Sequence, residues 1–114
     1  MRRFEMHRTF RERDIAAFVL HTSGGTHVSL YGGDLPHIGA VGIVDLEGNC
    51  TVTEFPGHKE GIVCQTWATA LSTAGFRPAV VEVGIHYENL DKAGISAVLL
   101  LTDELLKEFL QKNF

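Results

Sequence analysis

Three histidines share a setting in which an imidazole could bind a ligand or transfer a proton. His37, His58 and His86 each lie near a glycine, at a boundary between a predicted strand and the segment beside it. A neutral imidazole can bind a metal, hydrogen-bond an anion or exchange a proton near neutral pH. A glycine alongside removes a side chain, so that a ligand or another backbone segment can come close. We therefore predict that these boundaries meet at one edge of a sheet and form a shared site.

The residues after Pro56-Gly57 add features that favour an anion. His58 and Lys59 come just before a predicted helix, whose first backbone N–H groups and positive dipole end attract phosphate or carboxylate. Glu60 is either an ordinary first-turn carboxylate or a proton acceptor. The sequence contains no phosphate-loop, GxGxxG or G-x-S-x-G pattern, so nucleotide hydrolysis and serine hydrolase chemistry have no motif support.

A metal site is the main catalytic alternative. Zinc or iron held by His37, His58 and His86, with Asp34 or Glu60 as the base, would support a hydrolase or a lyase. However, 21 residues lead from His37 to His58 and 28 from His58 to His86. No pair has the spacing of an H-x-x-x-H motif, so the ligands would have to converge through the fold.

Each of these segments also has a structural explanation. Gly32-Gly33-Asp34 makes a good turn, with glycine for positive φ and aspartate for capping its own loop. Pro56-Gly57 is a turn as well, and His86 alone is unremarkable. The functional hypothesis depends on the segments meeting in space. The remaining histidines lie within or beside predicted strands and lack the special neighbours of the other three. We predict that they are ordinary surface or partly buried residues: His7, His21 and His27.

The elements that must position these residues begin with five predicted strands. Alternating polar and apolar residues, short apolar runs and turns rich in glycine and proline indicate them. The pair Gly24-Gly25 favours a hairpin. We predict that the five strands form an antiparallel meander. Their ranges are 4–10, 15–20, 26–31, 37–46 and 50–55.

Helical spacing begins after the fifth strand. Residues 62–74 predict a helix that ends at Gly75, and the valine-rich run Ala79–His86 predicts a sixth strand. Asn89 and Asp91 are candidate caps for one long terminal helix. A strand over 96–101 followed by a second helix also fits, although we favour the single helix because the 3.6-residue pattern continues without a break. The order βββββαβα indicates an α+β fold, a mostly antiparallel sheet of about six strands with two helices packed on one face.

Composition limits the class of protein. With 45% hydrophobic and 21% charged residues, the 114-residue chain indicates one globular domain, residues 1–114. A net charge of −4 without a long basic run argues against nucleic acid. No apolar run reaches the ~18–20 residues of a membrane span, and the first residues lack a signal-peptide core, so we expect a cytoplasmic protein with no membrane association. Cys50 and Cys64 are then expected to be free thiols.

Three motifs resemble a known family. In order and roughly in spacing, GGDLPHIGAV from Gly32, FPGHKE from Phe55 and GIHYEN from Gly84 are similar to the small prenylated-flavin chaperone-like domain. That domain is associated with the D subunit of gallate and protocatechuate decarboxylases of the UbiD type. It is also similar in fold to the proteasome assembly chaperones, small α+β proteins that dimerise. The resemblance covers residues 14–114.

The resemblance implies a non-catalytic accessory role. The protein would help a UbiD-type decarboxylase subunit to acquire or keep prenylated FMN, by binding prenylated FMN or FMN, or by binding the enzyme. It also implies a homodimer. A flavin whose phosphate binds at the start of the first helix, near His58 and Lys59, would agree with both the resemblance and the anion site predicted from the helix start. Carried over residue by residue, cofactor binding falls on Gly32, Gly33, Asp34, His37, Gly39, Gly57, His58, Lys59, Glu60, Gly84, His86 and Asn89.

A third hypothesis is a protein-interaction module like the proteasome assembly chaperones. The histidine segments would then be structural, and an apolar sheet face or helix pair would bind the partner. Phe109, Leu110 and Phe114 could belong to such a surface, although packing of the terminal helix explains the first two equally well.

Overall fold

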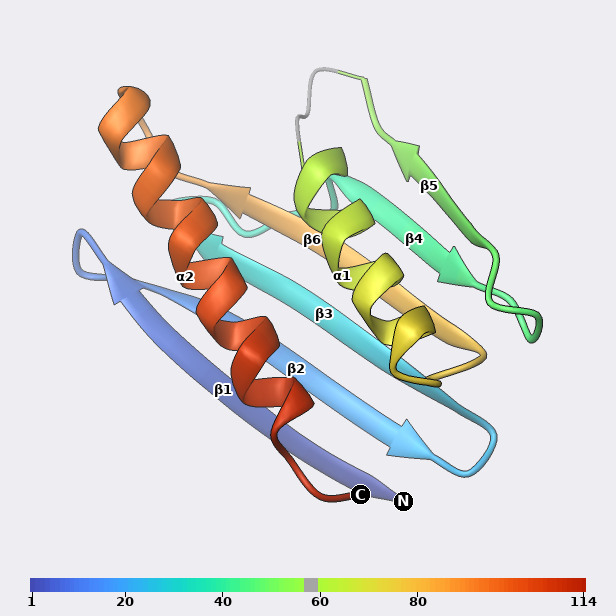
Figure 1. Ribbon diagram of the computed structural model, residues 1–114. Coiled ribbons are helices and arrows are strands. Elements are labelled where there is room, and N and C mark those ends of the chain that lie inside the picture. Colours follow the sequence, from blue (N-terminus) through green and yellow to red (C-terminus); the bar gives the residue numbers. More distant parts are fainter. Residues whose placement is uncertain (57–59) are drawn as a thin grey trace.

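The structure is a computed structural model that describes residues 1–56 and 60–114. Within them, six strands form one sheet and two helices lie against it (Figure 1). The sequence therefore predicted the α+β class and the order βββββαβα correctly. The elements are β1 (Arg2–Phe10), β2 (Arg13–Thr22), β3 (Gly25–Gly33), β4 (Ala40–Val44), β5 (Cys50–Glu54), α1 (Gly61–Thr73), β6 (Ala79–His86) and α2 (Lys92–Leu110).

The strand order differs from the predicted meander. Adjacent strands run β1-β2-β3-β6-β4-β5, so β6 is inserted between β3 and β4. It pairs parallel with β3 and antiparallel with β4, while the other neighbours are antiparallel. The parallel pairing requires a long crossover, which the chain makes through β4, β5 and α1. The valine-rich composition of β6 is typical of a central strand, and this was the sequence signal for its position.

The core lies between the sheet and the helices. Side chains alternate along the strands, and one set faces α1 and α2. The largest fully buried side chains include Trp67 of α1, Phe109 of α2 and Leu30 of β3. Figure 1 shows both helices on the same face of the sheet and the two chain ends side by side. The opposite face of the sheet carries no helix among the described residues.

The long terminal helix is a single element, as the sequence favoured. Asp91 caps it, because its Oδ1 accepts a hydrogen bond from the Gly94 N–H at 2.8 Å. α1 ends as predicted at Gly75, which has a φ of +88° and is followed by a bond from the Phe76 N–H to the Leu71 carbonyl at 2.9 Å.

The fourth strand is shorter than predicted. It begins at Ala40, so His37 lies in the connection that precedes the strand instead of at its first position. Pro36 has no N–H to donate, and the N–H of Gly39 is bonded to the Val83 carbonyl at 2.8 Å. The connection thus follows the end of β6 without forming a regular ladder.

Two observations concern the broad class of this protein. No helix among the described residues is long and apolar enough to cross a membrane. Cys50 and Cys64 are both free thiols, as predicted.

Candidate ligand-binding site

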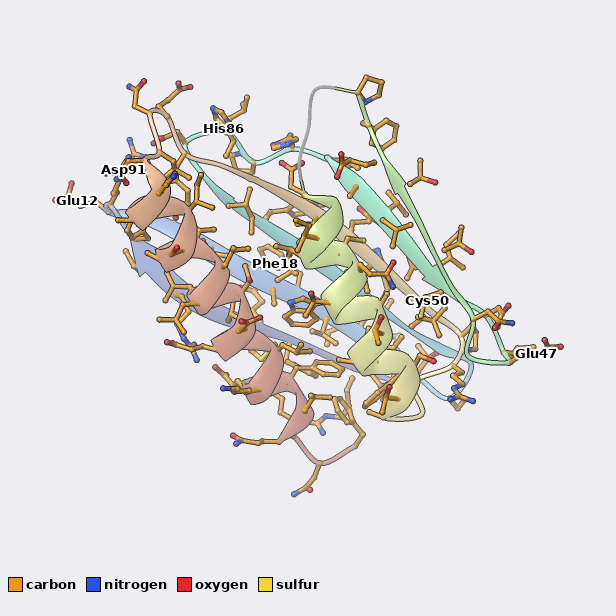
Figure 2. All side chains as sticks on the ribbon, turned by 45° about the horizontal axis from the view of Figure 1, so that its top comes forward. Glu12, Phe18, Glu47, Cys50, His86 and Asp91 are labelled. Carbon is orange, nitrogen blue, oxygen red and sulfur yellow. The ribbon has the colours of Figure 1, made fainter. Side chains whose placement is uncertain are left out.

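Two of the three candidate histidines meet at one end of the sheet. The parallel register of β3 and β6 places Gly33 beside His86, and the Asp34 N–H donates to the His86 carbonyl at 2.7 Å. The connection from β3 to β4 therefore passes over the end of β6. As a result, the rings of His37 and His86 lie 6.5 Å apart between centroids, at 75° to each other. Figure 2 shows His86 at the same end of the molecule as Asp91, which caps α2.

The third histidine cannot be placed in this way. Gly57, His58 and Lys59 lie outside the described residues. Their neighbour Glu60 is described, and it stands directly before α1. It brings a carboxyl group from a third segment to the same end of the sheet.

His37 and Glu60 form a closely packed pair. The Nε2 atom of His37 lies 2.8 Å from Oε1 of Glu60, and the two side chains are 16% and 12% exposed. The Nδ1 atom lies 2.9 Å from the Leu35 carbonyl oxygen. A carbonyl oxygen can only accept, so Nδ1 carries the hydrogen and donates it. A hydrogen on either Nε2 or Oε1 would then make their 2.8 Å contact a hydrogen bond.

Glycines allow these segments to approach one another. A Cβ at Gly39 would overlap the carboxyl group of Glu60, and a Cβ at Gly84 would overlap the backbone of His37. Gly33 has a φ of +82°, and a Cβ there would overlap the His86 carbonyl. The sequence analysis allowed either a ligand or a backbone as the reason for these glycines. For Gly33 and Gly84 the neighbour is backbone, and for Gly39 it is the Glu60 carboxyl.

Asp34 holds two loops together. Its Oδ1 lies 3.3 Å from Nε of Arg13, and its Oδ2 accepts a hydrogen bond from the Glu88 N–H at 3.0 Å. Asn89 follows with a φ of +55°, a conformation that asparagine tolerates. Gly32 packs against the backbone of β2, where a Cβ would overlap Asp14 and Ile15. These three predicted site residues shape the backbone around the histidines.

The described part of the α1 N-terminus is acidic. Oε2 of Glu54 accepts a hydrogen bond from the Gly61 N–H at 2.8 Å, so a protein carboxylate already occupies the first N–H of the helix. Glu60 adds a second carboxyl group beside it. Two carboxyl groups oppose the binding of a phosphate at this point. The phosphate position predicted from the helix dipole depends on His58 and Lys59, which lie outside the described residues.

An apolar groove begins beside the His37–Glu60 pair. It has a volume of about 460 Å³, its floor is the end of β6, and α1 and α2 supply its walls. Glu60 and His86 are the polar residues that line it. The other lining residues are aliphatic, including Ile62 and Val63 of α1, Val83 and Ile85 of β6, and Ile95 and Leu99 of α2.

The groove was not predicted from the sequence, in which Ile62, Ile95 and Leu99 fit the apolar positions of the two predicted helices. In the structure, Ile62 is 73% exposed and Ile95 is 48% exposed. No local signal marked the groove, because an apolar helix face is equally typical of packing against the core.

A smaller cleft of about 140 Å³ continues between the helices, lined by Trp67, Thr102 and parts of the groove wall. Trp67 is fully buried. Its Nε1 and the Oε2 of Glu60 are buried without a hydrogen-bond partner among the described residues. Buried donors and acceptors of this kind usually have a partner.

The catalytic alternative gains no support from the geometry. Among residues 1–56 and 60–114, no group of three or more histidine, cysteine, aspartate and glutamate side chains is placed to hold a metal ion. Burial raises the pKa of the Cys64 thiol to about 12, so this thiol is a poor nucleophile at neutral pH.

A comparison with solved structures agrees with the fold. A chain in the crystal structure of a chaperone complex for yeast 20S proteasome assembly has a similar fold, with a TM-score of 0.56 and 19% identity. The match covers 96% of this chain and 99% of that one. At that identity the likeness concerns the fold alone. No curated protein sequence matches the chain.

The family is shown by the sequence itself. Residues 9–113 match the family described as the prenylated flavin chaperone LpdD-like domain, and the chain belongs to that family. Family membership supports an accessory chaperone role, in agreement with the resemblance noted from the three motifs. Neither comparison supports a hydrolase.

Proposed function

We propose that this protein is a non-catalytic chaperone that binds prenylated FMN, or FMN, in the groove between α1 and α2. The supporting observation is the groove itself, an apolar space of about 460 Å³ that ends at the His37–Glu60 pair and His86. Small-molecule sites in proteins commonly have volumes of about 300–1,000 Å³ and combine apolar walls with a few polar groups. A prenylated flavin ring is large, flat and mainly apolar, and it suits such walls.

The polar end of the groove gives the ring an orientation. The hydrogen-bonding edge of the flavin lies toward Glu60 and His37, and the added apolar ring lies between Ile95 and Leu99 of α2 and Ile62 of α1. Oε2 of Glu60 has no partner among the described residues, which suits a ligand N–H group after a small movement of the side chain. In this proposal His58 and Lys59 contact the flavin ring system and not its phosphate.

The phosphate lies outside the groove in this proposal. Glu54 and Glu60 make the start of α1 unfavourable for it. On the other side of the opening, the His86 side chain is 45% exposed. Arg11 adds a positive charge nearby, since its Nη1 donates to the Glu88 carbonyl at 3.0 Å. The Glu88 carboxyl group lies 3.3 Å from Nε2 of His86, so a phosphate bound here would take the place of this carboxyl group beside the imidazole.

The role of the chaperone is to hold the cofactor for an enzyme. A UbiD-type decarboxylase subunit is the proposed partner, and the proposal includes a cytoplasmic location and a homodimeric chaperone. A groove that is open along one side can release a ring system to an enzyme without unfolding. Family membership supports a carrier, and among residues 1–56 and 60–114 no three histidine, cysteine, aspartate or glutamate side chains are grouped to hold a metal ion.

A titration with the flavin tests the proposal directly. Trp67 is the sole tryptophan of the chain and lies beside the groove, so a bound flavin should quench its fluorescence. Prenylated FMN and FMN should each give a saturable signal, with prenylated FMN binding more tightly. Absence of binding at ~100 μM of both flavins would overturn the proposal, since this concentration detects even weak complexes.

Substitutions in the wall of the groove test whether the flavin binds there. Ile95→Glu and Leu99→Glu place a charge in the apolar wall and should weaken binding at least tenfold. Leu100→Glu is the matched control, because Leu100 lies on the same helix, is 59% exposed and does not line the groove. Equal loss of binding in the control and in the groove variants would place the flavin elsewhere.

A second candidate function is a protein-interaction module without a cofactor. The observation that favours it is the likeness in fold to the chain from the proteasome assembly chaperone complex. His37→Ala and His58→Ala distinguish the two functions. A pure interaction module should keep its affinity for a purified decarboxylase partner in both variants, whereas a flavin site should lose flavin affinity.

A further inference from the structure

The face of the sheet opposite the helices carries a hydrogen-bonded group of polar side chains near its centre. Both helices pack on the other face (Figure 1). Oε1 of Glu82 lies 2.7 Å from Nε2 of His27, and Oε2 accepts a hydrogen bond from the Tyr31 hydroxyl at 2.7 Å. The side chains of His27 and Glu82 are 45% and 21% exposed. The groove between the helices includes none of these three residues.

The contact with Glu82 determines which nitrogen of His27 accepts a hydrogen bond. The Tyr31 hydroxyl, with His27 contributing, lowers the pKa of Glu82, so this carboxylate is ionised at neutral pH. An ionised carboxylate only accepts hydrogen bonds, and Nε2 of His27 therefore carries the hydrogen. In the neutral imidazole, Nδ1 is then an acceptor whose tautomer the carboxylate holds in place. No described residue donates a hydrogen bond to this Nδ1 atom.

The His27 ring lines a hollow in the surface of the sheet. The hollow has a volume of about 360 Å³ and lies over β2, between β1 and β3. The strand register places Leu20 between Arg3 and His27. Because neighbouring strands are about 4.8 Å apart, the backbones of Arg3 and His27 are separated by about 10 Å. Phe18, which is 40% exposed, also lines the hollow. One aromatic ring fits over Leu20 between the two polar side chains.

The β1 side of the hollow is positively charged. Arg3 is exposed and lines this side. Glu5 lines it as well, but its Oε2 lies 2.9 Å from Nε2 of His7, so its carboxyl group already has a partner. A guanidinium group binds a carboxylate through two parallel hydrogen bonds. The hollow therefore has an anion-binding group on β1 and, on β3, the imidazole of His27.

We propose that this hollow is a second binding site, for a small aromatic carboxylate whose ring carries a hydroxyl group opposite the carboxyl group. The carboxylate binds the guanidinium group of Arg3, and the ring lies over Leu20 beside Phe18. The hydroxyl group donates a hydrogen bond to Nδ1 of His27. Small-molecule sites commonly combine apolar walls with a few polar groups in volumes of about 300–1,000 Å³, and this hollow is at the lower end of that range. The site lies on the opposite face from the proposed flavin site and does not depend on it.

Other classes of ligand match the hollow less well. Among the described residues, Arg3 supplies the sole permanent positive charge of the lining, and Glu5 lies on the same side. One positive charge matches a monoanion, whereas a phosphate dianion would keep an unbalanced charge beside Glu5. An uncharged aromatic ring would cover the guanidinium group without giving it a partner. A hydroxylated aromatic carboxylate supplies one group for each side of the hollow.

NMR titrations of the whole protein with 4-hydroxybenzoate test the proposal. The backbone amide signals of Leu20 and His27 should shift and saturate with a Kd of about 0.1–1 mM, which is reasonable for a ligand of about ten non-hydrogen atoms. Benzoate lacks the hydroxyl group and phenol lacks the carboxylate, so each should bind at least fivefold more weakly. Absence of any shift at ~10 mM 4-hydroxybenzoate, or equal affinity for all three compounds, would overturn the proposal.

Two substitutions assign the contacts. Arg3→Gln should weaken the binding of 4-hydroxybenzoate and benzoate at least fivefold and leave phenol unchanged. His27→Gln should weaken the binding of 4-hydroxybenzoate and phenol and leave benzoate unchanged. Lys107→Gln is the control for charge, because it removes one positive charge from α2 on the other face, and it should change none of the three affinities. Equal losses in Arg3→Gln and Lys107→Gln would reveal only a general attraction of anions and would overturn the site.

Two further results keep the test decisive. If circular dichroism shows that a variant does not fold, the comparison of the three compounds on the wild-type protein still decides the proposal. Saturation of the protein with FMN should leave the affinity for 4-hydroxybenzoate unchanged, because the groove lies on the opposite face. Competition between the two would overturn the hollow as a separate site. A protein that binds neither FMN nor prenylated FMN but binds 4-hydroxybenzoate would refute the flavin proposal alone.

Discussion

Gly39 lies against the carboxyl group of Glu60, and any larger residue at position 39 requires that side chain to move. A Cβ at position 39 would overlap both carboxyl oxygens and the carbon that joins them. The same carboxyl group lies 2.8 Å from Nε2 of His37. A glycine two residues after the histidine therefore fixes where the acid of the pair can lie.

The first prediction concerns this glycine. Gly39→Ala should displace Glu60 from His37 and lower the free energy of unfolding by about 1–3 kcal/mol, the usual cost of overpacking a closed site. Urea denaturation followed by circular dichroism measures it. Gly24→Ala is the control, since the nearest atom to its added Cβ is Oγ1 of Thr22 at 3.8 Å. Equal stability of the two variants would show that Glu60 has another position available.

The second prediction concerns the tautomer of His37. Its Nδ1 must donate to the Leu35 carbonyl at 2.9 Å, so long-range ¹H–¹⁵N NMR spectra should show a hydrogen on Nδ1 whether or not Nε2 is protonated. Glu60→Gln should keep this tautomer, because the Leu35 contact does not involve residue 60. His86, which is exposed, is the internal comparison and should show the usual mixture of tautomers. A His37 signal with the hydrogen only on Nε2 would contradict the proposed pair.

The fold class could be predicted from the sequence because each element has a clear local signal. Period-two and period-3.6 patterns with glycine and proline at their ends gave the order βββββαβα. The strand order could not be predicted in the same way. The insertion of β6 between β3 and β4 depends on contacts between segments far apart in the chain, and a local pattern does not specify them.

The candidate site was partly predictable for the same reason. Strand boundaries with glycine beside histidine correctly indicated that His37 and His86 lie close together, at 6.5 Å between ring centroids. The groove was not predictable, because it depends on how far apart α1 and α2 lie on the sheet. Ile62 and Ile95 look like core residues in either case, and only the spacing of the helices leaves them at the walls of an open space.

The third prediction concerns the reactivity of the two cysteines. Burial raises the pKa of the Cys64 thiol to about 12, so hardly any thiolate forms at mildly alkaline pH. Cys50 is only partly buried. In the folded protein, iodoacetamide should therefore label Cys50 and spare Cys64, and both should react in urea. Mass spectrometry of the labelled peptides measures this, and comparable labelling of Cys64 in the native state would contradict its burial.

The fourth prediction concerns the contribution of Glu82 to stability in acid. The Tyr31 hydroxyl is the main group that lowers the pKa of Glu82, with His27 contributing. A carboxylate with a lowered pKa in the folded state stabilises the protein above its ordinary pKa, and this contribution is lost as the pH falls through the folded-state value. Tyr31→Phe should therefore lower the free energy of unfolding by about 1 kcal/mol at neutral pH. This decrease should be smaller in acid, at pH values below the ordinary pKa range of glutamate.

Tyr87→Phe is the matched control for that measurement. Its hydroxyl donates to the Arg13 carbonyl at 3.0 Å, and this acceptor does not titrate. Tyr87→Phe should therefore lower the free energy of unfolding by the same amount at neutral and at acid pH. Both variants are to be unfolded at the same protein concentration, because any self-association would add to the apparent stability. If the cost of Tyr31→Phe is constant between neutral and acid pH, the hydroxyl does not stabilise the ionised form of Glu82. The carboxylate would then depend on His27 alone.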